Sequence, residues 1–165
     1  MTNVMRIGGR GPGVLTFLLD FGKGWLAVKL TGIGSVSLSD DPEIQYLLIT
    51  LIGCSAVIGH VFSVFLKFRG GKGVSTLFGI LAALNIFIFL LATSVWVGIF
   101  VWKRISSLSA LIMLGLLPWL FLLVPWLTLK TASWHQFFVV FALSSLLIYK
   151  HRENIKRLLS GEEGQ

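Results

Sequence analysis

The chain has 165 residues, of which 55% are hydrophobic and 13% are charged, and its mean hydropathy is +0.87. These values exclude an ordinary water-soluble domain and predict a helical membrane protein. The net charge of +7 does not indicate nucleic-acid binding, because the cations lie in short loops between apolar segments. We therefore expect anionic lipid or a small anionic substrate as the partner, and no nucleic acid.

Apolar segments follow one another along almost the whole chain, and several reach the roughly 20 residues that a spanning helix needs. They predict an all-α, polytopic membrane helical bundle that forms a single domain over residues 1–165, with about six transmembrane or half-membrane helices. The segments lie at about 14–33, 44–66, 74–102, 105–129 and 133–149.

The first predicted helix, 14–33, carries two charges inside its apolar sequence. Asp20 and Lys23 are three residues apart and so share one helix face. They either neutralise each other or line a polar cavity, since a lone charge in lipid is costly. His60, at the end of the next predicted helix (44–62), is expected to cap that helix or to lie at the membrane interface.

The loop at 66–76 reads LKFRGGKGVST and combines cations with glycines. Glycines let backbone N–H groups approach an anion closely, and neighbouring cations add charge, so the loop is typical of a phosphate cradle. It lacks the Walker spacing, because Leu66 and Gly73 stand where that motif needs Gly and Ser or Thr. A basic loop that only fixes membrane topology is an equally good interpretation.

The segment 74–102 decides the topology. Read as one span, it would place six basic residues outside, so we predict two short helices that break near Asn85. The acidic sequence at 39–43 then lies outside, and all basic clusters meet on the cytoplasmic face. These clusters are Arg6/Arg10, Lys67/Arg69/Lys72, Lys103/Arg104 and Lys150/Arg152/Lys156/Arg157.

The cytoplasmic tail, 150–165, holds a second group of polar residues. His151 and Asn154 share a helix face, so a histidine able to donate to phosphate or shuttle a proton lies beside an orienting amide. The alternative is a basic helix lying on the cytoplasmic leaflet. The three histidines are far apart and no H-E-x-x-H occurs, so we expect no metal and no cofactor.

Two stretches, GHVFSVFLKFRGGKGVST and YKHRENIKRLLSG, resemble the bacterial acyl-phosphate:glycerol-3-phosphate acyltransferase family. TNVMRIGGRGPGVLTFLLDFGKG resembles the end of that family's first motif and the helix after it, so the likeness covers essentially the whole chain. The resemblance implies transfer of a fatty acyl group from acyl phosphate to the 1-hydroxyl of glycerol 3-phosphate, giving lysophosphatidate and phosphate in phospholipid synthesis. It also implies a multi-pass enzyme of the bacterial inner (plasma) membrane, surrounded by membrane lipid, with its active site and C-terminus facing the cytoplasm.

The resemblance implies specific site residues. Those expected to hold phosphate and take part in catalysis are Arg6, Lys72, His151 and Asn154. The substrate-binding set is Thr2, Asn3, Arg10, Gly70, Gly71, Gly73 and Ser107, of which the first three belong to the motif loop at 1–13. Glu153 is expected to hold the tail in place and not to perform chemistry.

The sequence departs from the family pattern in two places. Ser63 replaces the usual proline before the loop at 66–76, which we call the glycine-lysine loop. This replacement is expected only to loosen the start of the loop. The family's first helix and its S-G-N-x-G sequence are absent, so Met1 is interpreted as an internal methionine of an N-terminally truncated chain with poor activity. The alternatives to an active acyltransferase are a small anion transporter or channel, and a non-catalytic remnant of the enzyme.

Overall fold

The computed structural model describes residues 8–32, 38–127 and 133–163. Over these ranges the chain forms seven α-helices, numbered α2 to α8, and no strand. Three of the described helical segments are long and apolar enough to cross a membrane: Pro42–Leu66, Ile86–Lys103 and Ser106–Leu127. The all-α membrane architecture predicted from the sequence is therefore confirmed. The chain divides into two compact units, one ending at Ile86 and the other beginning at Phe87.

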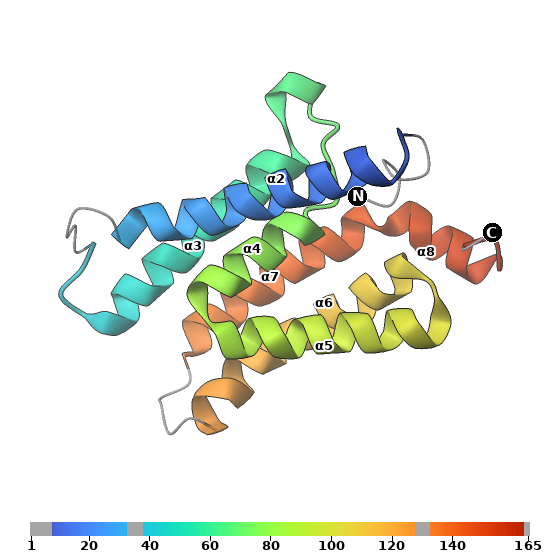
Figure 1. Cartoon of the computed structure of the whole chain (residues 1–165). Coiled ribbons are helices and arrows are strands. Elements are labelled where there is room, and N and C mark those ends of the chain that lie inside the picture. The colour runs from blue at the N-terminus through green and yellow to red at the C-terminus, as the bar shows by residue number, and fades with distance from the viewer. Residues whose placement is uncertain (1–7, 33–37, 128–132, 164–165) are drawn as a thin grey trace. The chain divides into compact units, whose positions relative to one another are not determined.

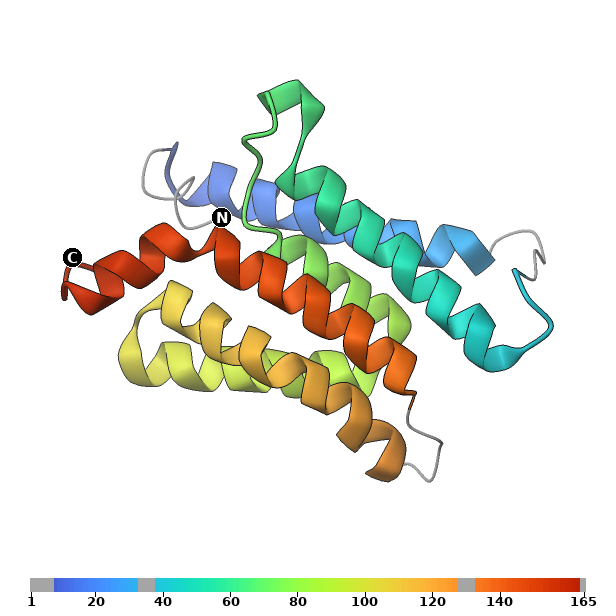
Figure 2. The same cartoon turned by 180° about the vertical axis from the view of Figure 1, so that it is seen from behind.

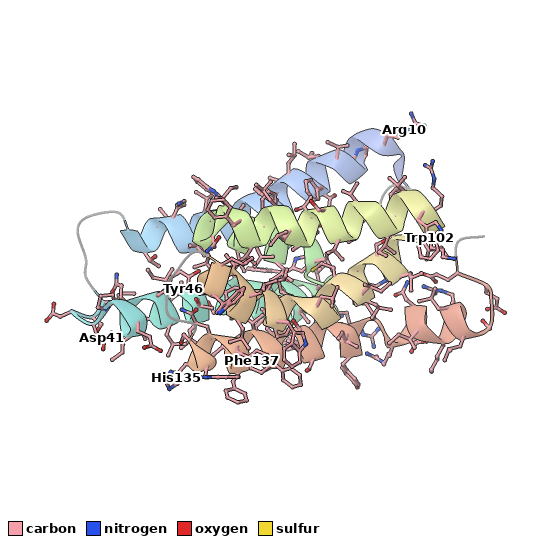
Figure 3. All side chains as sticks on the ribbon, turned by 90° about the horizontal axis from the view of Figure 1, so that it is seen from below. Arg10, Asp41, Tyr46, Trp102, His135 and Phe137 are labelled. Atoms are coloured by element: carbon pink, nitrogen blue, oxygen red, sulfur yellow. The ribbon has the colours of Figure 1, made fainter. Side chains whose placement is uncertain are left out.

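The first unit contains α2 (Arg10–Lys29), α3 (Pro42–Val61) and α4 (Val74–Leu84), with short 3₁₀ turns at Leu30–Gly32 and Val64–Leu66. Helix α2 begins at Arg10, so the segment 1–13 is not a loop throughout, although the sequence predicts one. Pro12 is compatible with this start because it falls in the first turn, where a proline removes no intrahelical hydrogen bond. Asp41 caps the start of α3, and its carboxylate accepts hydrogen bonds from the backbone N–H groups of Glu43 (2.8 Å) and Ile44 (3.3 Å). Figure 3 shows Arg10 and Asp41 at opposite ends of this unit, so α2 and α3 run in opposite directions.

Close contact between α2 and α4 forms the centre of the first unit, and the two helices lie side by side in Figure 1. A Cβ atom at Gly24 would overlap the carbonyl oxygen of Thr76, and one at Gly79 would overlap that of Phe21. Each helix therefore presents a glycine to the backbone of the other, which is the usual way for membrane helices to approach closely. This contact fixes the start of α4, and with it the end of the glycine-lysine loop.

Helix α4 ends at Leu84, and Asn85 is extended, with φ −155° and ψ 110°. Helix α5 (Ile86–Lys103) begins at the next residue. The break predicted near Asn85 is thus confirmed, whereas the membrane sides of the two helices stay a prediction.

The second unit contains α5, α6 (Ser106–Leu127), α7 (Trp134–Lys150) and the short α8 (Arg152–Leu159). Helices α6 and α7 pack along each other in Figure 2, and Leu117 and Phe121 of α6 and Leu147 of α7 are almost completely buried. Aromatic rings meet near the start of α7, where Phe137 lies 5.2 Å from Trp119 and 5.9 Å from Trp134 between ring centroids. At the opposite end of α7, His151 follows Lys150 and leads into α8.

Candidate functional site

The glycine-lysine loop leaves the end of α3 and returns to it before α4 begins. Lys67 and Phe68 have φ angles of 50° and 62°, the left-handed region that non-glycine residues rarely adopt. The chain then returns at Gly70, whose N–H donates to the carbonyl oxygen of Val61 (3.2 Å). Both ends of the loop therefore lie at the end of α3, and contacts with this helix end set the loop conformation.

Two of the loop glycines are required by His60. A Cβ atom at Gly70 would overlap the carbonyl oxygen of His60, and one at Gly71 would overlap its imidazole ring. Gly73 has a φ of +80° and occupies the N-cap position of α4. These glycines thus have steric reasons that are separate from any need to approach an anion.

The start of α4 has the properties of an anion site. No side chain caps this helix, and the first N–H groups of a helix have no partners inside it. Such an end attracts anions through these donors and the helix dipole. Lys72 lies directly before Gly73, so a cation accompanies the helix end, as the phosphate-cradle interpretation of the loop requires.

Asp20 and Lys23 form the neutralising pair expected from their spacing, with 2.5 Å between the Lys23 ammonium and Asp20 Oδ1. The same ammonium lies 2.5 Å from His60 Nδ1. The pair therefore extends into a network of three residues that joins α2 to the end of α3.

In the second unit, donors from distant parts of the sequence meet at the Glu163 carboxylate. The Ser107 hydroxyl at the start of α6 donates to Glu163 Oε1 (2.6 Å), and the Asn154 amide in α8 donates to the same oxygen (2.5 Å). Arg157 Nε donates to Oε2 (2.7 Å). Ser107 and Asn154, both assigned to the site by family resemblance, are thus brought together at a position that accepts a negatively charged oxygen.

Glu163 is held in its ionised form. Burial alone would raise the pKa of this carboxyl, but the hydrogen bonds from Ser107, Arg157 and Asn154 outweigh burial and lower the pKa to about 2. The hydrogen bond from Arg157 to Glu163, together with the negative charge of Glu163, raises the pKa of Arg157. Glu163 therefore places a negative charge beside Ser107, Asn154 and Arg157 at every physiological pH.

His151 is buried at the junction between α7 and α8, with 3% of its surface exposed. Its Nδ1 lies 2.7 Å from the carbonyl oxygen of Leu147. Because a carbonyl only accepts hydrogen bonds, Nδ1 carries the proton, and Nε2 is the acceptor in the neutral ring. A neutral His151 can thus accept a proton or a hydroxyl hydrogen bond, and it can donate from Nε2 only when it is protonated.

The remaining predicted residues fall into two groups. Thr2, Asn3 and Arg6 lie outside the described residues. Arg10 is exposed at the first residue of α2 (Figure 3). Among the described residues, no group of three or more His, Cys, Asp or Glu could hold a metal ion.

The tail is held by a different carboxylate from the one expected. Glu153 is exposed, and its ion pairs with the described residues lie within α8, at 3.7 Å from Arg152 and 3.6 Å from Lys156. Glu163 makes the bonds to α6 and α8 instead, because the chain turns back after Ser160 and brings it over Asn154. The spacing of residues in the tail gave no sign of this return, and both Glu163 and Arg157 were missed.

Comparison with known proteins gives consistent matches over nearly the full chain. The family model for glycerol-3-phosphate acyltransferase matches residues 1–161. A glycerol-3-phosphate acyltransferase from Aquifex aeolicus (strain VF5) is 40% identical over 98% of this chain and 78% of its own length. One from Nitrosospira multiformis is 37% identical over 99% of this chain and 76% of its own length.

Two crystal structures of PlsY (YgiH), an integral membrane glycerol 3-phosphate acyltransferase, have the same fold. The glycerol 3-phosphate form is 38% identical, with a TM-score of 0.79 over 99% of this chain and 76% of that one. The lysophosphatidic acid form is 39% identical, with a TM-score of 0.78 over 99% of this chain and 77% of that one. With these matches added to its loop and tail motifs, the chain belongs to the glycerol-3-phosphate acyltransferase family.

Proposed function

We propose that the protein transfers a fatty acyl group from acyl phosphate to the 1-hydroxyl of glycerol 3-phosphate, giving lysophosphatidate and inorganic phosphate. The observation that carries this proposal is the uncapped start of α4, with Lys72 before it, in a chain of this family. This arrangement suits a phosphate group, and a related structure was obtained in a glycerol 3-phosphate form. The family match disfavours the alternative of an anion transporter or channel.

The reaction needs little chemistry from the protein because acyl phosphate is already activated. The 1-hydroxyl oxygen attacks the acyl carbonyl carbon, the bond from that carbon to the phosphate oxygen breaks, and phosphate leaves. The hydroxyl proton passes by way of His151 Nε2 to an oxygen of the leaving phosphate. No covalent enzyme nucleophile is required, because the phosphate is already a good leaving group. Catalysis then depends on positioning two anionic substrates and on stabilising the oxyanion that forms at the carbonyl.

The residues of each unit have separate parts in this proposal. Lys72 and the start of α4 hold a phosphate group. His151 accepts a hydrogen bond from the 1-hydroxyl at Nε2, because its Nδ1 proton is engaged by the Leu147 carbonyl. Ser107 and Asn154 belong to the same site in this proposal, and their hydrogen bonds to Glu163 hold both side chains in place.

We further propose that these residues face the cytoplasm of a bacterial inner membrane. Within the second unit, the α5–α6 connection and α8 lie at one end (Figure 2), and the Ser107–Glu163 bond ties them together. The exposed tryptophans Trp119, Trp126 and Trp134 lie toward the end of α6 and the start of α7, as an interfacial aromatic belt would. A helix of 22 residues, such as α6, is about 33 Å long and separates two such interfaces.

To test which acyl donor the protein uses, the purified protein is given labelled glycerol 3-phosphate with acyl phosphate, acyl-coenzyme A or acyl-carrier protein in turn. We expect labelled lysophosphatidate with acyl phosphate only, because the proposed site binds a phosphate group next to the acyl carbonyl, which a thioester lacks. Formation of product from a thioester at a comparable rate would contradict the proposed donor. Absence of product with all three donors would contradict the proposed function.

A further inference from the structure

A polar network lies directly under the glycine-lysine loop. Lys23 Nζ is 2.5 Å from Asp20 Oδ1 and 2.5 Å from His60 Nδ1. The side chains of Asp20 and His60 are only 16% and 15% exposed. Pairing of Asp20 with Lys23 would be enough to neutralise the two charges in an apolar helix. The inclusion of His60 therefore needs a further explanation.

The contacts of the His60 ring give the network a direction. An ammonium group has only hydrogen-bond donors, so Nδ1 of His60 must accept from Lys23, and the ring proton lies on Nε2. Of the His60 ring atoms, Nε2 is nearest to the place where a Cβ atom of residue 71 would lie. Asp20 thus holds Lys23 and also lies 3.4 Å from His60 Nδ1, Lys23 holds the ring in one tautomer, and the ring supports Gly71.

The backbone of His60 supports the same loop. Gly70 packs against the His60 carbonyl oxygen, and its N–H bonds to the next carbonyl, that of Val61. Lys72 follows Gly71 immediately, and Gly73 is the N-cap of α4. A shift of the His60 ring would therefore move the backbone that carries the phosphate-binding cation, and small misplacements of such groups are costly to a reaction.

We propose that Asp20, Lys23 and His60 form a positioning network that fixes the glycine-lysine loop so that Lys72 and the start of α4 bind the substrate phosphate. None of the three residues contacts the reacting atoms in this proposal. The network acts through Gly70 and Gly71, and its loss leaves the catalytic groups present but the phosphate site loose. The kinetic part of this inference rests on the proposed function, whereas the structural part does not.

The test uses His60→Ala, Lys23→Met and the double variant in the full chain, purified in detergent. We expect His60→Ala to raise KM for glycerol 3-phosphate at least 10-fold while kcat changes less than threefold, because the phosphate site loosens and the reacting groups remain. Lys23→Met should raise KM in the same direction. The double variant should resemble His60→Ala, because Lys23 acts through the ring and coupled residues are not additive.

Hydrogen exchange measured by mass spectrometry gives a readout that does not depend on catalysis. The amides of residues 66–76 should exchange at least 10-fold faster in His60→Ala than in the parent, with no change in the helices of the second unit. The matched controls are His135→Ala, at the start of α7, and Lys29→Met, in the last turn of α2. Both controls should match the parent in exchange and in KM.

Loop exchange in His60→Ala within twofold of the parent would overturn the inference. So would a fall in kcat with KM unchanged, or effects of His60→Ala and Lys23→Met that multiply in the double variant. If the loop exchanges faster but the parent transfers no acyl group, the proposed function fails and the positioning of the loop by the network still stands.

Discussion

Glu163 secures the C-terminal end of the second unit. Its carboxylate receives hydrogen bonds from Ser107, Asn154 and Arg157, and only 11% of its side chain is exposed. One of these donors lies 56 residues away in the chain. Removing the negative charge would leave buried donors without a strong acceptor, which is more costly than the loss of one exposed ion pair.

We expect Glu163→Gln to lower the free energy of unfolding by about 1.5–3 kcal/mol at neutral pH, the range for hydrogen bonds to a charged group. Because folding lowers the pKa of this carboxyl from 4.5 to about 2, its contribution is complete above pH 4.5 and disappears as the pH falls toward 2. Unfolding of parent and variant in detergent, followed at several pH values, measures the difference. Glu162→Gln is the matched control, since Glu162 is exposed. A difference between parent and Glu163→Gln that stays constant from pH 7 to pH 2 would refute this explanation.

The sequence allowed part of the site to be predicted at the level of residues. The pairing of Asp20 with Lys23 follows from local spacing, which a helix conserves as it folds. The site roles of Lys72 and Gly73 come from the family resemblance and stay predictions. The bonds of Glu163 to Ser107, and of Lys23 to His60, join residues 56 and 37 positions apart. Contacts of that kind depend on how helices pack, so no periodicity in the sequence could show them.

At the scale of helices, the contact between α2 and α4 depends on two glycines that face the partner's backbone. A Cβ atom at Gly79 would overlap the Phe21 carbonyl and lie 2.9 Å from the backbone nitrogen of Trp25. Backbone cannot rotate away as a side chain can, so the helices must separate to admit a larger residue. The start of α4 would then move together with the loop that precedes it.

Gly79→Val should therefore lower the free energy of unfolding by at least about 2 kcal/mol, within the range for overpacked contacts. Gly98→Val in α5 is the control, because nothing lies within 4 Å of a Cβ atom built at Gly98. Thermal unfolding of both variants in the same detergent compares them directly. Equal midpoints for the two variants would show that α2 and α4 do not need this close approach.

Helix positions followed largely from apolar segment length, whereas the break at Asn85 followed from the distribution of basic residues along the chain. The start of α2 did not, because the sequence Gly-Pro-Gly at 11–13 is typical of a loop. The structure begins the helix at Arg10 and places Pro12 in the first turn, where its missing N–H has no consequence. Where a helix starts depends on which backbone N–H groups can be left without an intrahelical partner, and the composition of a segment does not show this.

At the scale of the whole molecule, the account requires the basic clusters to share one side of the membrane. With Cys54 replaced by Ala, single cysteines are introduced as Ser39→Cys, Ser106→Cys and Ser160→Cys. We expect the first to react with an impermeant thiol reagent added to intact cells and the other two to resist it, because cationic loops remain in the cytoplasm. Permeabilised cells, in which all three should react, provide the control. Labelling of Ser106→Cys from outside would refute the predicted topology.

The central claim is that Lys72 binds a substrate phosphate in acyl transfer to glycerol 3-phosphate. The most direct measurement is the rate of labelled lysophosphatidate formation from acyl phosphate by the parent, by Lys72→Ala and by Arg69→Ala, all at equal protein concentration. Arg69→Ala removes an exposed cation from the same loop and so controls for loop charge and membrane insertion. We predict a loss of at least about 100-fold for Lys72→Ala, equivalent to about 2.7 kcal/mol of transition-state stabilisation, and less than threefold for Arg69→Ala. Activity of Lys72→Ala within about threefold of the parent would contradict the account.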